Sequence, residues 1–449
     1  MYRFFGLFLI FLFLLAGCNS GGGSGGGNNN NAVLAANADL SDLTLSAGPL
    51  DQVFQANQTS YTATVGFLIA TTTVTPTTDD PDATVTVNGQ AVISATASDS
   101  IMLDEGLNTI KVIVTAEDGI TTRTYTLDVT RQTAADFAQQ AYLKASNIDA
   151  GDQFGFSVAL AGNTLAVGAV GEGSSTVLDQ DNNTVPGAGA VYVFTRNNGV
   201  WSQQAYLKAS NIDAGDQFGF SLALADNTLA VGAVGEGSST VLDQDNNTVP
   251  GAGAVYVFTR NNGDWTQQEY LKASNIDAGD QFGFSIALAD DTLAVGAVGE
   301  GSSTVLDQDN NTVPGAGAVY VFTRNNGDWT QQAYLKASNI DAGDLFGLVA
   351  LAGDTLAVGA VGEGSSTILN QDNNTAPGAG AVYVFTRNNG DWTQQVYVKA
   401  SNVDAGDQFG VVALSGDTLA VGAVGEGSST VLDQDNNTVP DAGAVYVFQ

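Results

Sequence analysis

Histidine does not occur in this sequence of 449 residues, and cysteine occurs once, at Cys18. Without imidazole, neither a Ser-His-Asp nor a Cys-His catalytic arrangement can form, and no histidine can bind a metal. A single cysteine forms no disulfide within the chain and no thiolate metal cluster. These absences exclude most of the common catalytic chemistries.

Positive charge is also scarce, because 13 Lys and Arg residues stand against 47 Asp and Glu residues. The resulting net charge of -34 repels polyanions. We therefore expect no nucleic-acid partner and weak attraction to acidic membrane surfaces, whereas cations such as Ca²⁺ are attracted. The length allows two or three domains with sizeable cores.

The first 18 residues predict a targeting segment. Arg3 precedes an apolar run at residues 4–15 that is too short for a comfortable bilayer span. The following Leu15-Ala16-Gly17-Cys18 resembles the lipobox of a bacterial lipoprotein signal peptide. The resemblance implies acylation of Cys18 after cleavage and, because Asn19 follows, a place at the outer membrane or cell surface. The alternative is a secreted protein whose signal ends near a cysteine.

Two all-β domains are predicted after this segment. Residues 19–32 are rich in Gly, Ser and Asn and predict a flexible linker. Residues 33–132 contain short runs that alternate in period two, with turns at Asn88-Gly89 and Asp118-Gly119, which favours a β-sandwich. This domain resembles the cadherin-like β-sandwich module of bacterial surface proteins, through residues 40–45, 87–89, 103–110 and 118–127. We expect it to be a spacer, with a binding module as the alternative.

An internal repeat dominates residues 133–449. Tyr142 recurs at a spacing of 64 residues, and the last copy follows after 63. Residues 206–269 and 270–333 differ at only three of 64 positions, which are Leu222/Ile286, Asn227/Asp291 and Glu269/Ala333. Such similar copies must share one local structure. A period of this length suits the four-stranded blade of a β-propeller.

Each repeat predicts four strands, at residues 156–161, 164–169, 190–195 and 201–208 in the first copy. The repeats begin with a fourth strand at 139–144 and end with a third strand at 445–448. Pairing these two segments would leave no free sheet edge, so we predict a five-bladed propeller closed in this way. An open arc that recruits blades from another chain is the alternative.

The repeats also resemble bacterial FG-GAP repeats, which are relatives of the integrin alpha-subunit propeller. The resemblance rests on Phe154-Gly155, residues 165–169 and 189–194, and their counterparts through 445–448. It implies extracellular binding or adhesion, commonly with Ca²⁺ in the blade loops. The D-x-D-x-D-G segment between strands one and two is replaced here by Ala161-Gly162-Asn163, so the usual calcium position is missing.

Two other acidic segments are candidate calcium ligands, because Ca²⁺ prefers oxygen donors. The first is a D-x-D-x-N loop that recurs in each repeat, at Asp179, Asp181 and Asn183; Asp243, Asp245 and Asn247; Asp307, Asp309 and Asn311; Asn370, Asp372 and Asn374; and Asp433, Asp435 and Asn437. The second is the turn formed by Asn147, Asp149 and Asp152. Either could instead be an Asx turn that caps its own backbone.

Three classes of function fit the sequence. The first is a lipid-anchored surface protein that binds or adheres to protein or glycan through propeller loops, and the second is a structural scaffold without a ligand. The third, a carboxylate-based glycoside hydrolase, needs two carboxylates in different environments, whereas here every acidic loop is copied around the ring. We therefore expect no enzyme activity.

Overall fold

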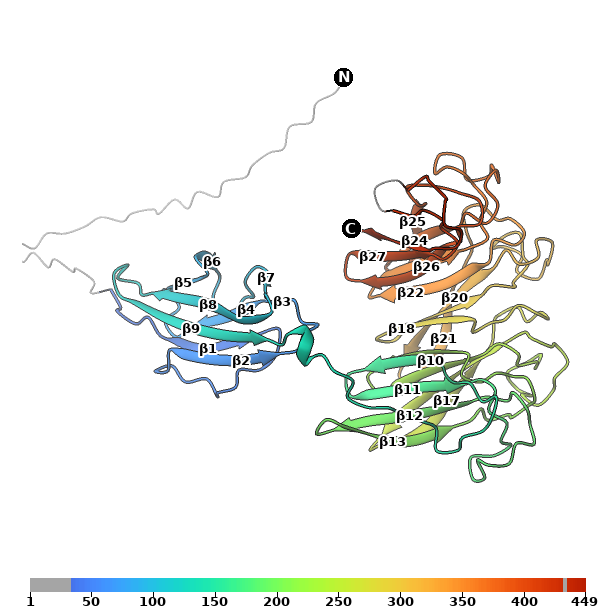
Figure 1. Ribbon diagram of the computed structural model, residues 1–449, viewed down its shortest axis with the longest axis horizontal. Coiled ribbons are helices and arrows are strands. Elements are labelled where there is room, and N and C mark those ends of the chain that lie inside the picture. Colours follow the sequence, from blue (N-terminus) through green and yellow to red (C-terminus); the bar gives the residue numbers. More distant parts are fainter. Residues whose placement is uncertain (1–33, 431–433) are drawn as a thin grey trace, which may run out of the picture. The chain divides into compact units, whose positions relative to one another are not determined.

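The structure is a computed structural model that describes residues 34–430 and 434–449. Cys18, the linker at 19–32 and Asp433 therefore lie outside the described residues. The chain divides into two compact units, Met1–Gln139 and Gln140–Gln449 (Figure 1). The described residues form β-strands and one short 3-10 helix, so the predicted all-β class is confirmed.

The first unit is sandwich-like, as predicted. A five-stranded sheet in the order β2-β9-β8-β5-β6 is accompanied by the pairs β1-β4 and β3-β7. The elements are β1 (Leu40–Leu45), β2 (Ser60–Val65), β3 (Thr71–Thr72), β4 (Val74–Thr78), β5 (Thr84–Val87), β6 (Gln90–Val92), β7 (Ile101–Met102), β8 (Gly106–Thr115), β9 (Thr122–Arg131) and the 3-10 helix Ala134–Asp136.

Alternation along these strands builds the core of the first unit. In β2, Tyr61, Ala63 and Val65 are buried while their neighbours are exposed. The buried Tyr125 hydroxyl accepts a hydrogen bond from the Leu40 backbone N–H at 3.0 Å. Period-two patterning therefore gave the correct inward face, because successive side chains of a strand point to opposite sides.

The second unit repeats one antiparallel sheet. Repeat 1 is β10 (Phe154–Ala161), β11 (Thr164–Ala169), β12 (Ala190–Asn197) and β13 (Val200–Leu207). Repeat 2 is β14 (Ser221–Ala225), β15 (Thr228–Ala233), β16 (Ala254–Asn261) and β17 (Asp264–Leu271). Repeat 3 is β18 (Ser285–Ala289), β19 (Thr292–Ala297), β20 (Ala318–Asn325) and β21 (Asp328–Leu335). Repeat 4 is β22 (Phe346–Ala352), β23 (Thr355–Ala360), β24 (Ala381–Asn388) and β25 (Asp391–Val398), and repeat 5 is β26 (Phe409–Ser415), β27 (Thr418–Ala423) and β28 (Ala444–Phe448).

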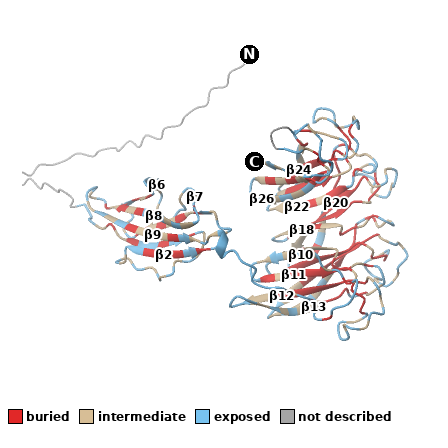
Figure 2. Ribbon diagram, viewed as in Figure 1, coloured by how far each residue is buried: buried red, intermediate tan, exposed pale blue. Residues whose placement is uncertain are grey.

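The second strand of repeats 1 to 4 lies in the interior, where it is largely buried on both faces. All six residues of β15 are buried, and Figure 2 shows the same concentration of buried residues along the middle strands of the repeats. A Cβ on Gly232 would collide with the carbonyl oxygen of Gly283 in the next repeat. Small residues are therefore required where neighbouring sheets approach most closely.

Aromatic side chains fill the wider space between neighbouring sheets. Phe282 contacts Tyr320 and Phe322 edge to face, with ring centroids 5.3 and 6.0 Å apart. The same buried cluster includes Val255 and Val257 from the preceding repeat. Four such cores are each shared by two successive repeats, so neighbouring repeats stabilise one another.

The predicted closure of the ring is not observed. Residues 139–144 form no strand, and β28 lies at the edge of a three-stranded sheet in the order β26-β27-β28. The first strands of successive repeats contact one another from β10 through β14, β18 and β22 to β26, but no comparable contact joins β26 to β10. Figure 1 shows an opening between these two strands. The contacts between successive repeats set the curvature of the unit, and the two ends do not meet.

Candidate functional site

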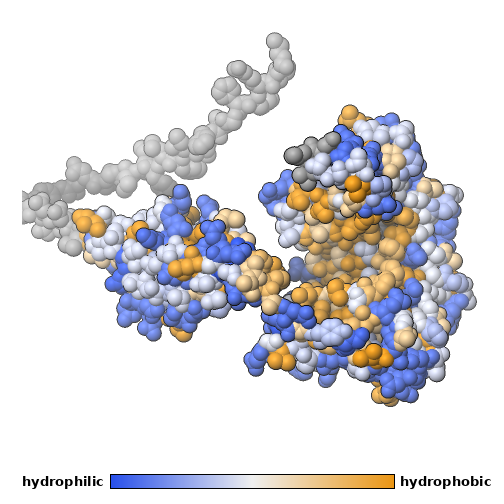
Figure 3. Space-filling model, viewed as in Figure 1, coloured by the Kyte–Doolittle hydropathy of each residue, from blue (hydrophilic) through white to orange (hydrophobic). Residues whose placement is uncertain are grey.

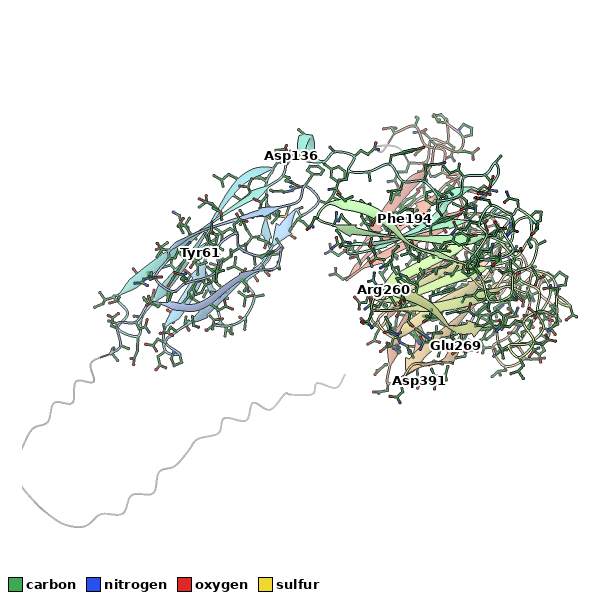
Figure 4. The ribbon with its side chains drawn as sticks, turned by 90° about the horizontal axis from the view of Figure 1, so that it is seen from below. Tyr61, Asp136, Phe194, Arg260, Glu269 and Asp391 are labelled. Atoms are coloured by element: carbon green, nitrogen blue, oxygen red, sulfur yellow. The ribbon has the colours of Figure 1, made fainter. Side chains whose placement is uncertain are left out.

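Each sheet of the second unit has a hairpin end and a loop end. The hairpin end carries the turns that connect the first strand to the second and the third to the fourth, and Arg260 and Asp391 lie there (Figure 4). The loop end carries a long loop between the second and third strands, at residues 170–189, 234–253, 298–317, 361–380 and 424–443. Both ends repeat their side chains, so each forms a surface of equivalent sites.

A buried ion pair anchors the base of the long loop in repeats 1 to 4. In repeat 2, the Lys272 ammonium lies 2.8 Å from Glu236 and donates a 2.6 Å hydrogen bond to the Gly253 carbonyl. Glu236 also accepts a hydrogen bond from the Ser238 backbone N–H at 2.8 Å. Burial lowers the pKa of Lys272, while the charge of Glu236 opposes that shift. The equivalent pairs are Lys208–Glu172, Lys336–Glu300 and Lys399–Glu363.

Two tyrosines and an asparagine complete this network. The Tyr256 hydroxyl donates to Asn211 Oδ1 at 2.7 Å, and Asn211 Nδ2 donates to the Gln244 carbonyl of the long loop at 3.0 Å. The Tyr270 hydroxyl bonds to Ser238. Burial raises the pKa of both tyrosines, so both hydroxyls stay protonated. The loop is held at its base and near its tip by side chains from three segments.

The second predicted calcium turn belongs to this network. Asn147, the counterpart of Asn211, is buried and bonds to Tyr192, Glu172 and the Gln180 carbonyl. Asp152 is buried too and accepts a 3.3 Å hydrogen bond from the Asp149 backbone N–H. Asn147 therefore helps to hold the long loop, and Asp152 caps the backbone of its own turn.

The counterparts of Asp152 are carboxyl groups whose surroundings disfavour ionisation. Burial, with the nearby charge of Glu236, raises the pKa of Asp216 to about 7. Asp280 and Asp344 have pKa values raised to about 7 for the same reasons. One carboxyl oxygen of Asp216 and one of Asp280 are buried without a hydrogen-bond partner. These groups are half protonated near neutral pH.

The first predicted calcium loop lies at the surface. Asp179, Asp181 and Asn183 are exposed, and Asn182 between them caps the loop by accepting hydrogen bonds from the Ser175 N–H and hydroxyl. Repeats 2 to 4 place their counterparts in the same way. Within residues 34–430 and 434–449, no three His, Cys, Asp or Glu side chains are close enough together to hold a metal ion.

An exposed leucine marks the tip of each described long loop. Leu178, Leu242, Leu306 and Leu369 are between 91 and 93 % exposed. The preceding residue is valine or isoleucine, which is also exposed. An isolated exposed leucine is ordinary, but four equivalent tips form a regular array of apolar contacts beside acidic side chains.

Polar grooves separate the repeats at the hairpin end. One groove of about 710 Å³ lies between repeats 1 and 2 and is lined by Arg196, Arg260 and Asn227, among others. Arg260 lies over the Trp265 ring at 5.2 Å and donates to Asn227 at 2.9 Å and to Thr164 of repeat 1 at 2.9 Å. In repeats 3 and 4, the arginine pairs with an aspartate instead. The two ends of the sheets thus offer different chemistry.

The Lys–Glu pairs were not predicted from the sequence. Their signal was present, because Lys208 follows Glu172 by 36 residues and the same two residues recur at that spacing in the next three repeats. A lysine that is copied without change, in a chain with few cations, is better explained by a buried partner than by solvent exposure.

No helix in the described parts of the chain has the length and apolar character needed to cross a membrane. The predicted lipid anchor lies on Cys18, outside those parts.

Comparisons with known proteins separate the two units. Residues 40–132 match the cadherin-like beta sandwich domain. A relative named "putative membrane protein", from Evansella cellulosilytica, is 43% identical over 103 residues, which are 23% of this chain and 15% of that protein. This chain therefore spans only a small part of that relative's length.

The repeat unit matches a family along most of its length. Five FG-GAP repeats match at residues 137–194, 201–258, 265–322, 329–385 and 392–448. These matches cover more than half of the chain. Each match after the first begins in the last strand of one sheet and continues through the first three strands of the next. The chain therefore belongs to the FG-GAP repeat family.

Proposed function

We propose that this chain is a surface binding or adhesion protein, tethered to the bacterial outer membrane through a lipid on Cys18. The FG-GAP repeats and the cadherin-like domain indicate a surface binding protein. The observation that carries the proposal is the array of exposed leucines at the long-loop tips, from Leu178 to Leu369. The buried Lys–Glu network below each loop holds the tip in place before any partner arrives.

The partner is a protein or glycan that meets several loops at once. Equivalent tips offer equivalent weak contacts, so linkage within one rigid unit multiplies their effect. Acidic side chains beside each tip disfavour polyanions, which argues against nucleic acid. The proposed role involves no catalysis, because the acidic loops recur with nearly the same sequence in successive repeats, whereas hydrolysis by two carboxylates needs unlike ones.

The loop tips can be tested by substitution. We expect the variant Leu178→Ser, Leu242→Ser, Leu306→Ser and Leu369→Ser to lose at least tenfold in affinity, measured by binding of the labelled full chain to a glycan array and to protein-coated surfaces. The matched control replaces exposed apolar residues of the first unit with Val53→Ser, Ile93→Ser and Ile120→Ser. Equal binding by both variants would show that the loop tips are not the binding surface. If the parent chain binds nothing, the alternative of a structural scaffold without a ligand is favoured.

In the proposed function, Ca²⁺ assists the binding of the partner by the long loops. The exposed Asp243, Asp245 and Asn247 and their counterparts would contribute some oxygen ligands, with water as the remainder. Calorimetric titration of CaCl₂ into the full chain tests this role, with Asp243→Asn and Asp245→Asn as the matched variant. The absence of both heat and thermal stabilisation would dismiss it.

The lipid anchor has its own test. We expect Cys18→Ser to move the chain from the membrane fraction to the soluble fraction, because the thiol is the proposed site of acylation. Ser20→Ala serves as the control. A Cys18→Ser chain that stays in the membrane fraction would contradict the anchor.

A further inference from the structure

The first and last repeats expose surfaces that are buried or half-buried in the repeats between them. Val255 and Val257 of β16 are fully buried and share one hydrophobic cluster with Ile286 of β18 in the next repeat. Their counterparts in repeat 5, Val445 and Val447, are 70 % and 67 % exposed. The last repeat therefore presents one half of an apolar interface that the chain forms four times internally.

The first repeat presents the other half. Val158 and Leu160 of β10 occupy the positions of Ile286 and Leu288, but both are exposed. The space-filling view shows hydrophobic walls on both sides of a hollow between the first and last repeats (Figure 3). The two exposed faces are complementary by sequence, because they are copies of faces that already pack together.

The polar network of the inner repeats is also divided between the two ends of the unit. In the described parts of the chain, the last repeat has the acid without its lysine, and the segment before the first repeat has the lysine and the tyrosine without their partners. Glu426 is buried, and within the described residues no lysine pairs with it; its Oε2 accepts a 2.9 Å hydrogen bond from Ser428. Lys144, the counterpart of Lys208, is exposed at the other end of the unit. Tyr142, the counterpart of Tyr206, is 81 % exposed, whereas Tyr206 bonds to the serine that corresponds to Ser428.

A cavity marks where these side chains belong. A space of about 340 Å³ beside β28 is lined by Glu426, Ser428, Val445 and Tyr446, among others. In repeats 1 to 4 the fourth strand of the sheet carries its tyrosine and lysine to this position. Repeat 5 thus has a formed site for a fourth strand that its own sheet does not contain.

We propose that a second copy of this chain fills the site with its residues 139–144. The register follows from β12 and β13, where Tyr192 is opposite Tyr206 and Val191 is opposite Leu207. By the same register, the incoming Tyr142 lies opposite Tyr446 and Leu143 lies opposite Val445. Lys144 then pairs with Glu426, and β10 of the second copy packs on the exposed valines of β28 as a sixth repeat would.

The curvature of the unit favours a second copy over the chain's own first segment. The four internal contacts between repeats join the corresponding faces of successive repeats and leave the two ends apart across the opening (Figure 1). Closing the ring would require each of these contacts to change, whereas a second copy docks with the contact as it stands. The interface is head to tail, so it either propagates or closes as a ring of copies.

Cysteine cross-linking tests the proposal in the full chain with Cys18→Ser, which removes the native thiol. We expect a mixture of Tyr142→Cys chains and Tyr446→Cys chains to form a disulfide-linked pair under mild oxidation, because directly opposed residues of paired strands lie within disulfide reach. The double variant should form a ladder of higher multiples. Tyr142→Cys mixed with the exposed Leu178→Cys is the control.

Two results would overturn the proposal. If the double variant cross-links only within single chains, the chain's own segment closes the ring. If neither the mixture nor the double variant cross-links above the control, residues 139–144 do not occupy the site.

Charge reversal provides an independent measurement by sedimentation. Lys144→Glu should weaken self-association at least tenfold, because it places a second acid beside the buried Glu426. Mixing it with Glu426→Lys chains should restore association between the two variants. Lys111→Glu, which changes an exposed lysine of the first unit, is the control. Unchanged association of Lys144→Glu would contradict the predicted pairing.

Discussion

At the residue scale, the buried ion pair between Lys272 and Glu236 represents an interaction that repeats 1 to 4 share. The side chains are 1 % and 0 % exposed, and backbone and amide groups satisfy their remaining hydrogen-bonding capacity. Such a pair gains little over an apolar replacement, but breaking one side strands a buried charge. Its role is therefore to fix the geometry of the loop rather than to add net stability.

Removing one partner tests this account. Lys272→Met should lower the free energy of unfolding by about 3–5 kcal/mol, because Glu236 is left buried and unpaired. Adding Glu236→Gln should recover part of the loss, since the remaining group is neutral. Chemical denaturation of the two variants and the parent chain measures both effects, and a double variant no better than the single one would contradict the explanation.

The buried aspartates predict a pH dependence with a definite sign. The folded-state pKa of Asp280 is raised to about 7, above its ordinary value, so its protonated form is favoured by folding. Its stabilising contribution is present below pH 4 and is lost as pH rises to about 7. At pH 8 we expect Asp280→Asn to raise the free energy of unfolding by about 1–3 kcal/mol, because the buried charge is removed.

Thermal unfolding from pH 4 to pH 8 checks that prediction. Asp280→Asn should flatten the decline in stability over this range relative to the parent chain. The control is Asp309→Asn, which changes an exposed loop residue. If both variants decline like the parent chain, the raised pKa of Asp280 is not the cause.

At the element scale, the long loop is ordered by contacts at its base while its tip stays free to bind. Tyr256 reaches this loop through Asn211, which bonds to the Gln244 carbonyl. Leu242 at the tip is exposed. Stability and binding should therefore depend on different residues of one loop.

Two substitutions separate these contributions. Tyr256→Phe should cost about 1–3 kcal/mol, because it removes the donor to the buried Asn211. It should also increase hydrogen exchange in residues 234–253. Leu242→Ser should change stability by less than about 0.5 kcal/mol, as expected for an exposed position. Equal exchange in both variants would argue against the proposed anchoring.

At the scale of the whole molecule, the second unit is an open, curved array in which each repeat contacts the repeats next to it in sequence. Residues 206–269 and 270–333 are nearly identical, so deleting 270–333 joins Glu269 to Tyr334 and recreates the same contacts. We expect the shortened chain to fold with unchanged strand content and a modestly lower melting temperature. Circular dichroism measures both, and loss of folding would show that the array depends on its number of repeats.

The internal repeat allowed the local structure of the second unit to be predicted from the sequence alone. Alternation, turn residues and near-identical copies predicted the four strands of repeats 1 to 4 and the three strands of repeat 5. The sandwich-like first unit followed from similar patterns, with Asn88 and Gly89 taking the left-handed backbone of a hairpin turn. Strand patterning is a local property, so it can be predicted from the sequence of a single chain.

The candidate site was less predictable because it depends on long-range approach. Asn147 was identified as a possible calcium ligand, yet it bonds to Tyr192 and to the long loop. The pairing of Lys208 with Glu172 joins residues 36 positions apart. Hydrogen-bond partners of this kind depend on which segments meet in space, which an oxygen-rich spacing does not specify.

Sequence by itself determined that this protein lacks imidazole chemistry, carries strong negative charge and contains five copies of one β-sheet unit. Only the tertiary structure decided that the array is open and that its two ends expose complementary surfaces. The physical reason is that a repeat fixes its own strands through local patterning, whereas closure depends on the angle between neighbouring sheets. That angle is set by packing between Gly232, Gly283 and the aromatic core, and it accumulates from one repeat to the next.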